Sequence, residues 1–322
     1  MRLEVVALSD APAPPDAGTG YPVTVVMNAG SGSTDKHAAR AEIEAGFRDF
    51  DLAVRIARRP PDVATLAAAA AIERPGLLVA AGGDGTLNAV AGVARAAGLP
   101  FAAIALGTFN YFARELGMPT EPGMAARAIA GGVLRRVPVG EMDGRLFLNN
   151  ASIGLYRRLV ERREQDKQRF GRSRLVAVAS GLVTLLREHQ PYRLRLDIDG
   201  RESVLSTPGV FFGRNALQLA RLGLDEALCV ARGELAVLAL REVGRRELLG
   251  LALRGATARL ETAGNLQQHC AASVEVDFAG RGPRRIRVAL DGELADCRLP
   301  LHVRVVPDAL TVVVPRPWGP PP

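Results

Sequence analysis

The chain contains a run of small and polar residues, GGDGTLN at 82–88, whose types and spacing suit the binding of an anion. The apolar residues 77–81 (LLVAA) precede it and predict a short buried strand, and residues 86–97 follow with the Ala-rich periodicity of a helix. Three glycines between strand and helix let bare backbone approach a ligand. Because the helix directs its N–H groups and positive dipole end at the same place, we expect a phosphate there.

An acid stands inside this run. Asp84 would repel a phosphate unless a Mg²⁺ ion or ligand hydroxyls lie between the two. Thr86 could cap the helix or bond a phosphate oxygen, and Asn88 adds an amide within reach. The run is neither a Walker A loop, since no Gly-Lys-Ser/Thr follows, nor the dinucleotide fingerprint, since its third glycine is missing. A tight corner without a ligand stays open as the alternative.

Two further predicted strands end in the same kinds of residue. Residues 23–27 (VTVVM) lead into NAGSGS at 28–33, and residues 101–105 (FAAIA) lead into LGTFN at 106–110. The carboxyl ends of parallel strands meet at one edge of a sheet, so the pattern predicts a ligand lying across that edge.

These motifs resemble those of the diacylglycerol kinase catalytic family, which includes bacterial soluble lipid kinases and sphingosine kinases. GGDGT alone also occurs in NAD kinases and phosphofructokinases, so the resemblance depends on an ordered set that covers about residues 22–315. The set consists of Asn28-x-x-Ser31-Gly32, GGDGTLN at 82–88, LGTxNxxAR at 106–114, FLNNASIG at 147–154 and Asp-Gly-Glu at 291–293.

The resemblance implies an ATP-dependent lipid kinase that uses Mg²⁺ and acts on a diacylglycerol-like or sphingoid-like hydroxyl. One of Asp291 and Glu293 would accept the proton of that hydroxyl, and we prefer Glu293. Asp84 would act through Mg²⁺, and Asp225 with Glu226 resembles a second magnesium site of the family. The residues expected to hold the nucleotide are Asn28, Ser31, Gly32, Gly82, Gly83, Asp84, Gly85, Thr86, Asn88 and Thr108.

The chain departs from the family pattern at several positions. Ala29 replaces a proline, Ala89 a glutamate and Tyr111 an aspartate, and Ala227 stands where the family has the glycine of Asp-Asp-Gly. These departures leave open a non-catalytic or weakly active nucleotide-binding relative. A kinase of a soluble substrate similar to NAD kinases is a second alternative, against which Asn28-x-x-Ser31-Gly32 and Asp291-Gly292-Glu293 argue.

The predicted fold class is α/β plus β, with an N-terminal Rossmann-like parallel sheet covered by helices on both faces and a C-terminal antiparallel β-sandwich. Four strands and four helices alternate through 22–138, near 23–27, 52–57, 77–81 and 101–105 for strands and 35–48, 62–73, 86–97 and 122–131 for helices. Residues 139–315 form the second predicted domain. The flanking segments, 1–21 and 316–322, are a predicted flexible extension and a Pro-rich tail.

Alternating polar and apolar residues predict half-exposed strands in the second domain, at 193–199, 273–278 and 285–290. Asp199-Gly200 is a strong turn signal. The Asp-Gly-Glu motif is predicted to be the turn between 285–290 and a strand at 301–306.

The net charge of +7 favours anionic partners, and an anionic phospholipid surface suits it better than nucleic acid, for which no motif is present. Residues 157–174, with eight basic and three acidic side chains, are either a solvated helix face or a membrane contact. No signal peptide and no apolar run of about 18 residues is evident, so we expect a cytoplasmic protein that associates peripherally with membranes. A homodimer is left open.

The three cysteines, Cys229, Cys270 and Cys297, have no CxxC spacing. They are predicted to be buried free thiols in a reducing compartment.

Overall fold

The computed structural model describes residues 21–30, 35–154, 191–221, 227–241 and 266–316. The chain divides into two compact units, one made of 1–139 with 306–322 and the other of 140–305. Each unit is described separately.

The first unit is built on a parallel sheet whose strand order is β2-β1-β3-β4. The strands are β1 (Pro22–Asn28), β2 (Asp51–Ala57), β3 (Leu77–Gly82) and β4 (Phe101–Ala105). The last part of β16 (Leu301–Val314) pairs parallel to β4, with Val312 opposite Phe101. Both β3 and β4 are buried along their whole length, which explains why their sequences are continuous apolar runs.

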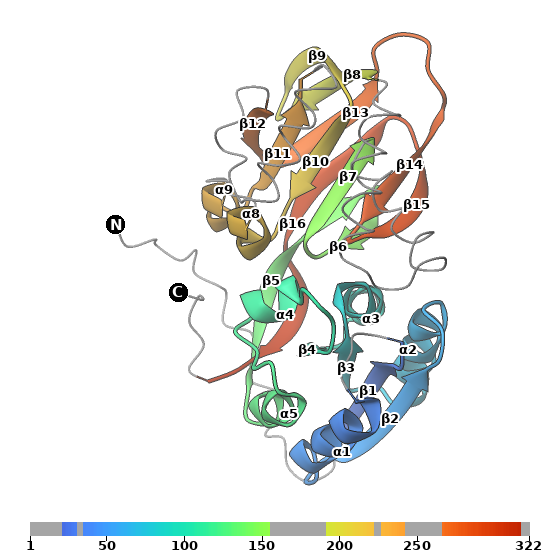
Figure 1. The fold of residues 1–322 in the computed structure, drawn as a ribbon, viewed down its shortest axis with the longest axis vertical. Helices are drawn as coiled ribbons and strands as arrows, with labels where there is room; N and C mark the ends of the chain where they lie inside the picture. The colour runs from blue at the N-terminus through green and yellow to red at the C-terminus, as the bar shows by residue number, and fades with distance from the viewer. Residues whose placement is uncertain (1–20, 31–34, 155–190, 222–226, 242–265, 317–322) are drawn as a thin grey trace. The chain divides into compact units, whose positions relative to one another are not determined.

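Helices cover both faces of this sheet (Figure 1). They are α1 (Lys36–Gly46), α2 (Asp62–Glu73), α3 (Asp84–Ala97), α4 (Tyr111–Glu115) and α5 (Pro122–Ala130). Helix α1 packs against α5, and α2 packs against α3. Because the chain reverses its direction across the sheet after β2, right-handed crossovers place these two pairs on opposite faces.

The second unit contains two antiparallel sheets. One has the order β12-β11-β10-β7-β14-β15, and the other contains β16-β13-β8-β9 together with a β5–β6 hairpin. The bounds are β5 (Val133–Met142), β6 (Arg145–Phe147), β7 (Asn150–Gly154), β8 (Tyr192–Ile198), β9 (Arg201–Thr207), β10 (Gly209–Gly213), β11 (Leu235–Leu240), β12 (Leu266–Ala271), β13 (Ser273–Phe278), β14 (Arg285–Leu290) and β15 (Glu293–Arg298).

The two sheets of this unit pack face to face around one apolar core. Ile153 and Val288 from the six-stranded sheet and Leu196 and Val276 from the other sheet belong to the same buried cluster. A smaller cluster covers the other face of the six-stranded sheet, where α8 (Ala216–Arg221) and α9 (Ala227–Ala231) pack. The predicted combination of a parallel α/β sheet and an antiparallel β-sandwich is therefore confirmed.

Three sequence predictions were wrong in detail. Residues 293–298 form strand β15, so the Asp-Gly-Glu hairpin joins β14 to β15 and not to the strand at 301. The prediction missed β15 because its sequence, ELADCR, has only a weak alternation. Residues 306–314 of β16 belong to the first unit, although the predicted second domain extended to 315. Cys229 and Cys270 are not free thiols but form a disulfide, with Cα atoms 5.2 Å apart.

Several predictions fall outside the described residues. These are the basic stretch at 157–174, Ser31, Gly32, Asp225, Glu226, and both terminal segments apart from Tyr21 and Arg316. Within the described part of the chain, none of the helices has the length and apolar character needed to cross a bilayer.

Candidate functional site

A side-chain hydrogen bond joins the end of β1 to the turn after β3. Asn28 Nδ2 donates to Thr86 Oγ1 at 3.0 Å, and Asn28 Oδ1 accepts from the Gly30 amide at 2.9 Å. Thr86 is buried against Gly82, where a Cβ would lie 2.5 Å from the Thr86 side chain. The packing of Thr86 therefore requires a glycine at position 82, and the Thr86 hydroxyl also holds the Asn28 side chain in place.

Helix α3 begins directly after the glycines of the turn. Gly83 is its N-cap, with an extended backbone (φ −90°, ψ −179°), and no side chain caps the helix. A helix start at the carboxyl end of a parallel strand suits the binding of phosphate oxygens by backbone N–H groups. Gly85 lies in the first turn of α3, and Asn88 follows in the same helix. The predicted helix start at 86 was two residues late, and Thr86 is not the cap because its hydroxyl is bonded to Asn28.

The turn after β4 is hydrogen-bonded to the turn after β3. Asn110 adopts a left-handed conformation (φ 54°), and its side chain bridges the Gly107 amide and carbonyl at 2.9 Å each. The Asn110 backbone N–H donates to Asp84 Oδ2 at 3.0 Å. Gly107 lies so close that a Cβ there would be 2.5 Å from the Gly83 Cα. The three turns predicted to share one edge of the sheet are thus joined, and Asn110, which the predicted site omitted, makes one of the connections.

Asp84 is the carboxylate that the turn after β3 contributes at this edge of the sheet. Within the described residues, no group of three or more His, Cys, Asp or Glu side chains could hold a metal. Mg²⁺ is commonly held by one or two carboxylates together with the phosphates of a nucleotide, so Asp84 beside a turn that is predicted to bind phosphate fits that mode.

Aromatic rings occupy the outer part of the third turn. Phe109 and Tyr111 stack with ring centroids 5.6 Å apart and planes 3° from parallel. Thr108, between Gly107 and Phe109, is exposed. Tyr111 stands where the family pattern has an acid, so this part of the edge is more apolar than the pattern implies.

The acid motif in the second unit is a two-residue hairpin turn. Asp291 (φ 48°) and Gly292 (φ 86°) both have positive φ, as a type I′ turn requires. The Asp291 carboxylate accepts from the backbone amides of Leu148, Asn149 and Asn150 at 2.6, 2.7 and 2.9 Å, respectively. Its own amide donates to the Asn150 carbonyl at 2.8 Å.

These contacts separate the two acids of the motif. Asp291 holds the chain before β7 against the turn through charge-assisted hydrogen bonds, which are the strong ones. Glu293 is the first residue of β15 and is exposed. Asp291 thus holds the turn in place, and Glu293 is the exposed acid of the motif.

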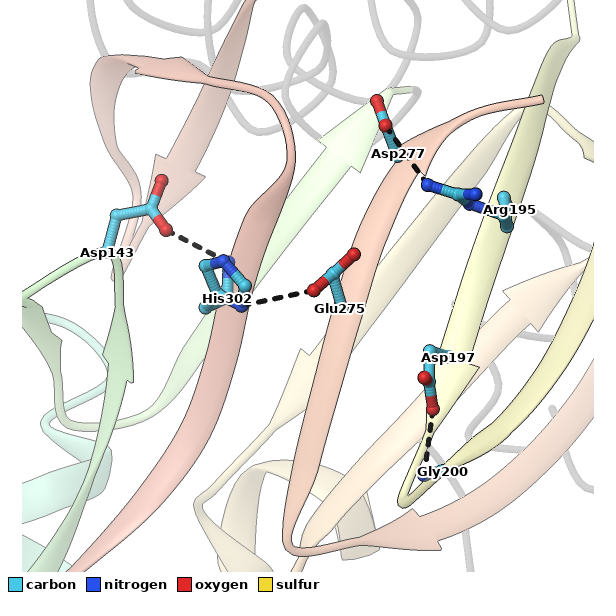
Figure 2. A network of polar contacts seen from close by, with 7 residues as sticks. All are labelled: Asp143, Arg195, Asp197, Gly200, Glu275, Asp277 and His302. Carbon is cyan, nitrogen blue, oxygen red and sulfur yellow. Dashed lines mark hydrogen bonds and ion pairs between the residues drawn. The ribbon is translucent and has the colours of Figure 1, made fainter. Parts of the chain in front are cut away.

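A second group of charged residues lines a cavity of about 480 Å³ within the second unit. The Asp143 carboxylate accepts from the His302 backbone at 2.9 Å, His302 Nδ1 lies 3.5 Å from Glu275, and Glu141 pairs with Arg304 at 2.8 Å. Figure 2 shows the network, whose labelled members are Asp143, Arg195, Asp197, Gly200, Glu275, Asp277 and His302. Each carboxylate lining the cavity already has a partner, so we assign the network to holding the strands together.

Residues 22–142 match the family model described as the diacylglycerol kinase catalytic domain. The resemblance inferred from the motifs is therefore confirmed. The matched segment contains the three turns that are predicted to bind the nucleotide, and the Asp-Gly-Glu turn lies beyond it.

Similar proteins carry corresponding names. A Pseudomonas aeruginosa protein named "Probable lipid kinase YegS-like" is 39% identical over 131 residues, which are 40% of this chain and 42% of that protein. A Mycobacterium tuberculosis protein named "Diacylglycerol kinase" is 27% identical over 306 residues, which are 91% of this chain and 95% of that protein. The aligned part thus spans less than half of the first of these relatives.

The fold also has solved counterparts. The crystal structure of a diacylglycerol kinase from Bacillus anthracis aligns with a TM-score of 0.63 and 16% identity, covering 93% of this chain and 98% of that one. At this identity the likeness shows the fold alone.

Proposed function

We propose that this protein is an ATP-dependent lipid kinase, which transfers the γ-phosphate of ATP to the hydroxyl of a lipid. The observation that carries the proposal is the joining of three strand-end turns, through Asn28–Thr86 and Asp84–Asn110, around the start of helix α3. The names of the similar proteins support a lipid as the acceptor.

Phosphoryl transfer requires positioning and neutralisation of charge more than covalent chemistry from the protein. The backbone N–H groups of 82–85 bind the nucleotide phosphates in this proposal, and Asn28 and Thr108 position phosphate or ribose oxygens. Asp84 holds Mg²⁺ beside the nucleotide, and Asp225 with Glu226 is the candidate for a second, separate magnesium site. Mg²⁺, when bound, neutralises the charge on the transferring phosphoryl group.

Glu293 is the proposed general base. A lipid hydroxyl has a pKa far above 7, so a carboxylate that accepts its proton during attack accelerates the reaction by about 10²–10⁴-fold. Asp291 contributes by fixing the turn on which Glu293 stands, through its bonds to the Leu148, Asn149 and Asn150 amides.

The lipid substrate places the proposed reaction at a membrane surface. The net charge of +7 favours contact with anionic phospholipid, and we propose a cytoplasmic protein that associates with membranes peripherally.

A weakly active nucleotide-binding relative is the second candidate, and one observation favours it. Tyr111 occupies the position of a family acid, and its ring is stacked on Phe109. A carboxylate that helps with metal or substrate is therefore replaced by an apolar surface.

One assay separates the candidates. Purified protein is incubated with γ-labelled ATP, Mg²⁺ and either lipid vesicles or NAD, and the products are separated by chromatography. Label in the lipid fraction supports the lipid kinase, and label in NAD supports a soluble-substrate kinase. ATP binding by calorimetry without transfer to any acceptor would indicate the weakly active relative.

A further inference from the structure

Two polar side chains on β7 are buried without a complete set of hydrogen bonds. Ser152 is fully buried, and its Oγ has no partner. Asn150 is 3% exposed, and its Oδ1 also has no partner. A buried polar group left without a hydrogen bond is destabilising, so such groups call for an explanation such as a bound partner or a function.

Both side chains point to the same face of the six-stranded sheet. Ala151 and Ile153, which alternate with them, belong to the sandwich core, so Asn150 and Ser152 face the opposite way. This second face is the one that α8 and α9 cover.

The neighbouring strands supply no polar side chain at these positions. Gly213 of β10 is opposite Asn150, and Ala289 of β14 is opposite Ser152. Leu219 of α8 packs over Gly213, where a Cβ would lie 2.7 Å from the leucine. Phe211 of β10 is also opposite Ser152, and Gln218 of α8 reaches Asn150. A few placed polar groups among apolar residues are typical of a site that orients an amphipathic ligand.

The available atoms define the chemistry of the ligand. Asn150 Nδ2 donates to Gln218 Oε1 at 2.9 Å, which fixes the amide and leaves Oδ1 as an acceptor. Ser152 can donate and accept. A group that satisfies both must therefore present at least one hydrogen-bond donor to Asn150, and an ester oxygen cannot do so.

The same strand is fixed to the acid turn. The Asn150 amide donates to Asp291 Oδ1 at 2.9 Å, and the Asn150 carbonyl accepts from the Asp291 amide at 2.8 Å. Glu293, the proposed base, follows two residues later on the same hairpin. These hydrogen bonds through the Asn150 main chain therefore fix the position of a ligand group held by Asn150 and Ser152 relative to the proposed catalytic turn.

We propose that Asn150 and Ser152 bind the polar group next to the reacting hydroxyl of the acceptor lipid, and that the preferred acceptor carries a second hydrogen-bond donor there. A second hydroxyl or an amide N–H meets this requirement, whereas the two esters of a diacylglycerol do not. The inference rests on the proposed kinase function and deepens it by naming the acceptor class.

The test compares three acceptors in mixed micelles: 1,2-diacylglycerol, 1-monoacylglycerol and an N-acyl sphingoid base. Wild type should show kcat/KM at least about tenfold higher for one of the two acceptors with a second donor, because a site built to hydrogen-bond a group rejects the analogue lacking it. Ser152→Ala should lower the ratio of kcat/KM for that acceptor to kcat/KM for diacylglycerol by about tenfold. The KM for ATP and the melting temperature should stay unchanged.

Thr24→Val is the matched control. Thr24 is also buried, and its hydroxyl also has no partner, but it lies within β1 of the first unit. Its removal should leave the acceptor preference unchanged. Asn150→Ala provides a second variant, expected to reduce the same preference.

Binding is measured separately from catalysis, by the rise in melting temperature that a short-chain monoacylglycerol produces. The rise should be smaller for Ser152→Ala than for wild type. Equal kcat/KM for all three lipids, together with an unchanged Ser152→Ala, would overturn the inference and leave the kinase proposal intact. Lipid binding that depends on Ser152 without any phosphoryl transfer would refute the kinase proposal and retain the site.

Discussion

The two units use the polar residues of their motifs in different ways. In the first unit, side chains from three turns bond to one another or to neighbouring backbone, as Asn28 does with Thr86 and Asp84 with Asn110. In the second unit, Asp291 bonds to main-chain amides, and nearby Asn150 and Ser152 keep polar atoms without partners.

This difference assigns different tasks to the two sets of residues. Where the ligand is a phosphate, backbone N–H groups can bind it, and the side chains serve mainly to hold the turns in place. Where the ligand is a hydroxyl-bearing lipid, side-chain oxygens must supply the recognition, and a rigid main chain must position them.

The largest effect on stability is expected from Asp291. Asp291→Ala leaves three backbone amides without their acceptor, and we expect a loss of about 3 kcal/mol in the free energy of unfolding, measured with denaturant. Asp296→Ala on the adjacent strand is the control. The Arg287 guanidinium lowers the pKa of Asp296, but this pair is exposed and should contribute little. Equal destabilisation by both variants would contradict the positioning role of Asp291.

A backbone contact in the first unit should show the next largest effect. Gly107→Ala places a Cβ against the Gly83 Cα and should push the third turn away from the phosphate-binding turn, weakening ATP binding by about tenfold. Gly92→Ala, in helix α3, meets no atom within 4 Å and should stabilise the protein by about 0.5–1 kcal/mol. Calorimetry of both variants with Mg·ATP measures the difference. An unchanged affinity in Gly107→Ala would show that the two turns need not be in contact.

A smaller effect is expected from the hydrogen bond between the first two turns. Asn28→Ala and Thr86→Val each remove the 3.0 Å bond, and each should weaken ATP binding about fivefold. The double variant should be little worse than either one, since the two side chains act through the same bond. Fully additive losses would mean that Asn28 and Thr86 act independently.

The smallest effect concerns pH and does not involve the site. Burial raises the pKa of the Cys297 thiol and of the Tyr21 hydroxyl. For both groups the pKa in the folded state lies above the pKa in the unfolded state. Their contribution to the free energy of unfolding is therefore fully present below the unfolded pKa, about 8.5 for cysteine, and is lost as the pH rises through the folded pKa. Cys297→Ala should reduce this loss between pH 8 and 10, as followed by thermal unfolding. An unchanged pH dependence in Cys297→Ala would show that this thiol does not cause the loss of stability.

The sequence was most informative where local pattern and tertiary structure agree. The buried runs at 77–81 and 101–105 predicted β3 and β4, and Asp199-Gly200 predicted the hairpin between β8 and β9. Each of these signals comes from a few adjacent residues, so no knowledge of distant contacts was needed.

Contacts between distant residues could not be predicted in this way. Asn28 and Thr86 are 58 residues apart, and Asn150 and Asp291 are 141 apart. The Cys229–Cys270 disulfide was missed because spacing alone does not define cysteine pairing. The roles of Asn110, Asn150 and Ser152 were overlooked although all three lie within the motifs, because only the structure shows which polar atoms have partners.

The most direct test of the account is the turnover of Glu293→Gln with γ-labelled ATP and a lipid acceptor that the wild-type protein phosphorylates, measured beside its ATP affinity. The substitution keeps the size of the side chain and leaves the Asp291 contacts in place, while it removes the capacity to accept a proton. We expect kcat to fall about 10²-fold or more, with ATP affinity and melting temperature unchanged. Near-normal turnover in a folded Glu293→Gln variant would contradict the assignment of the base to this turn.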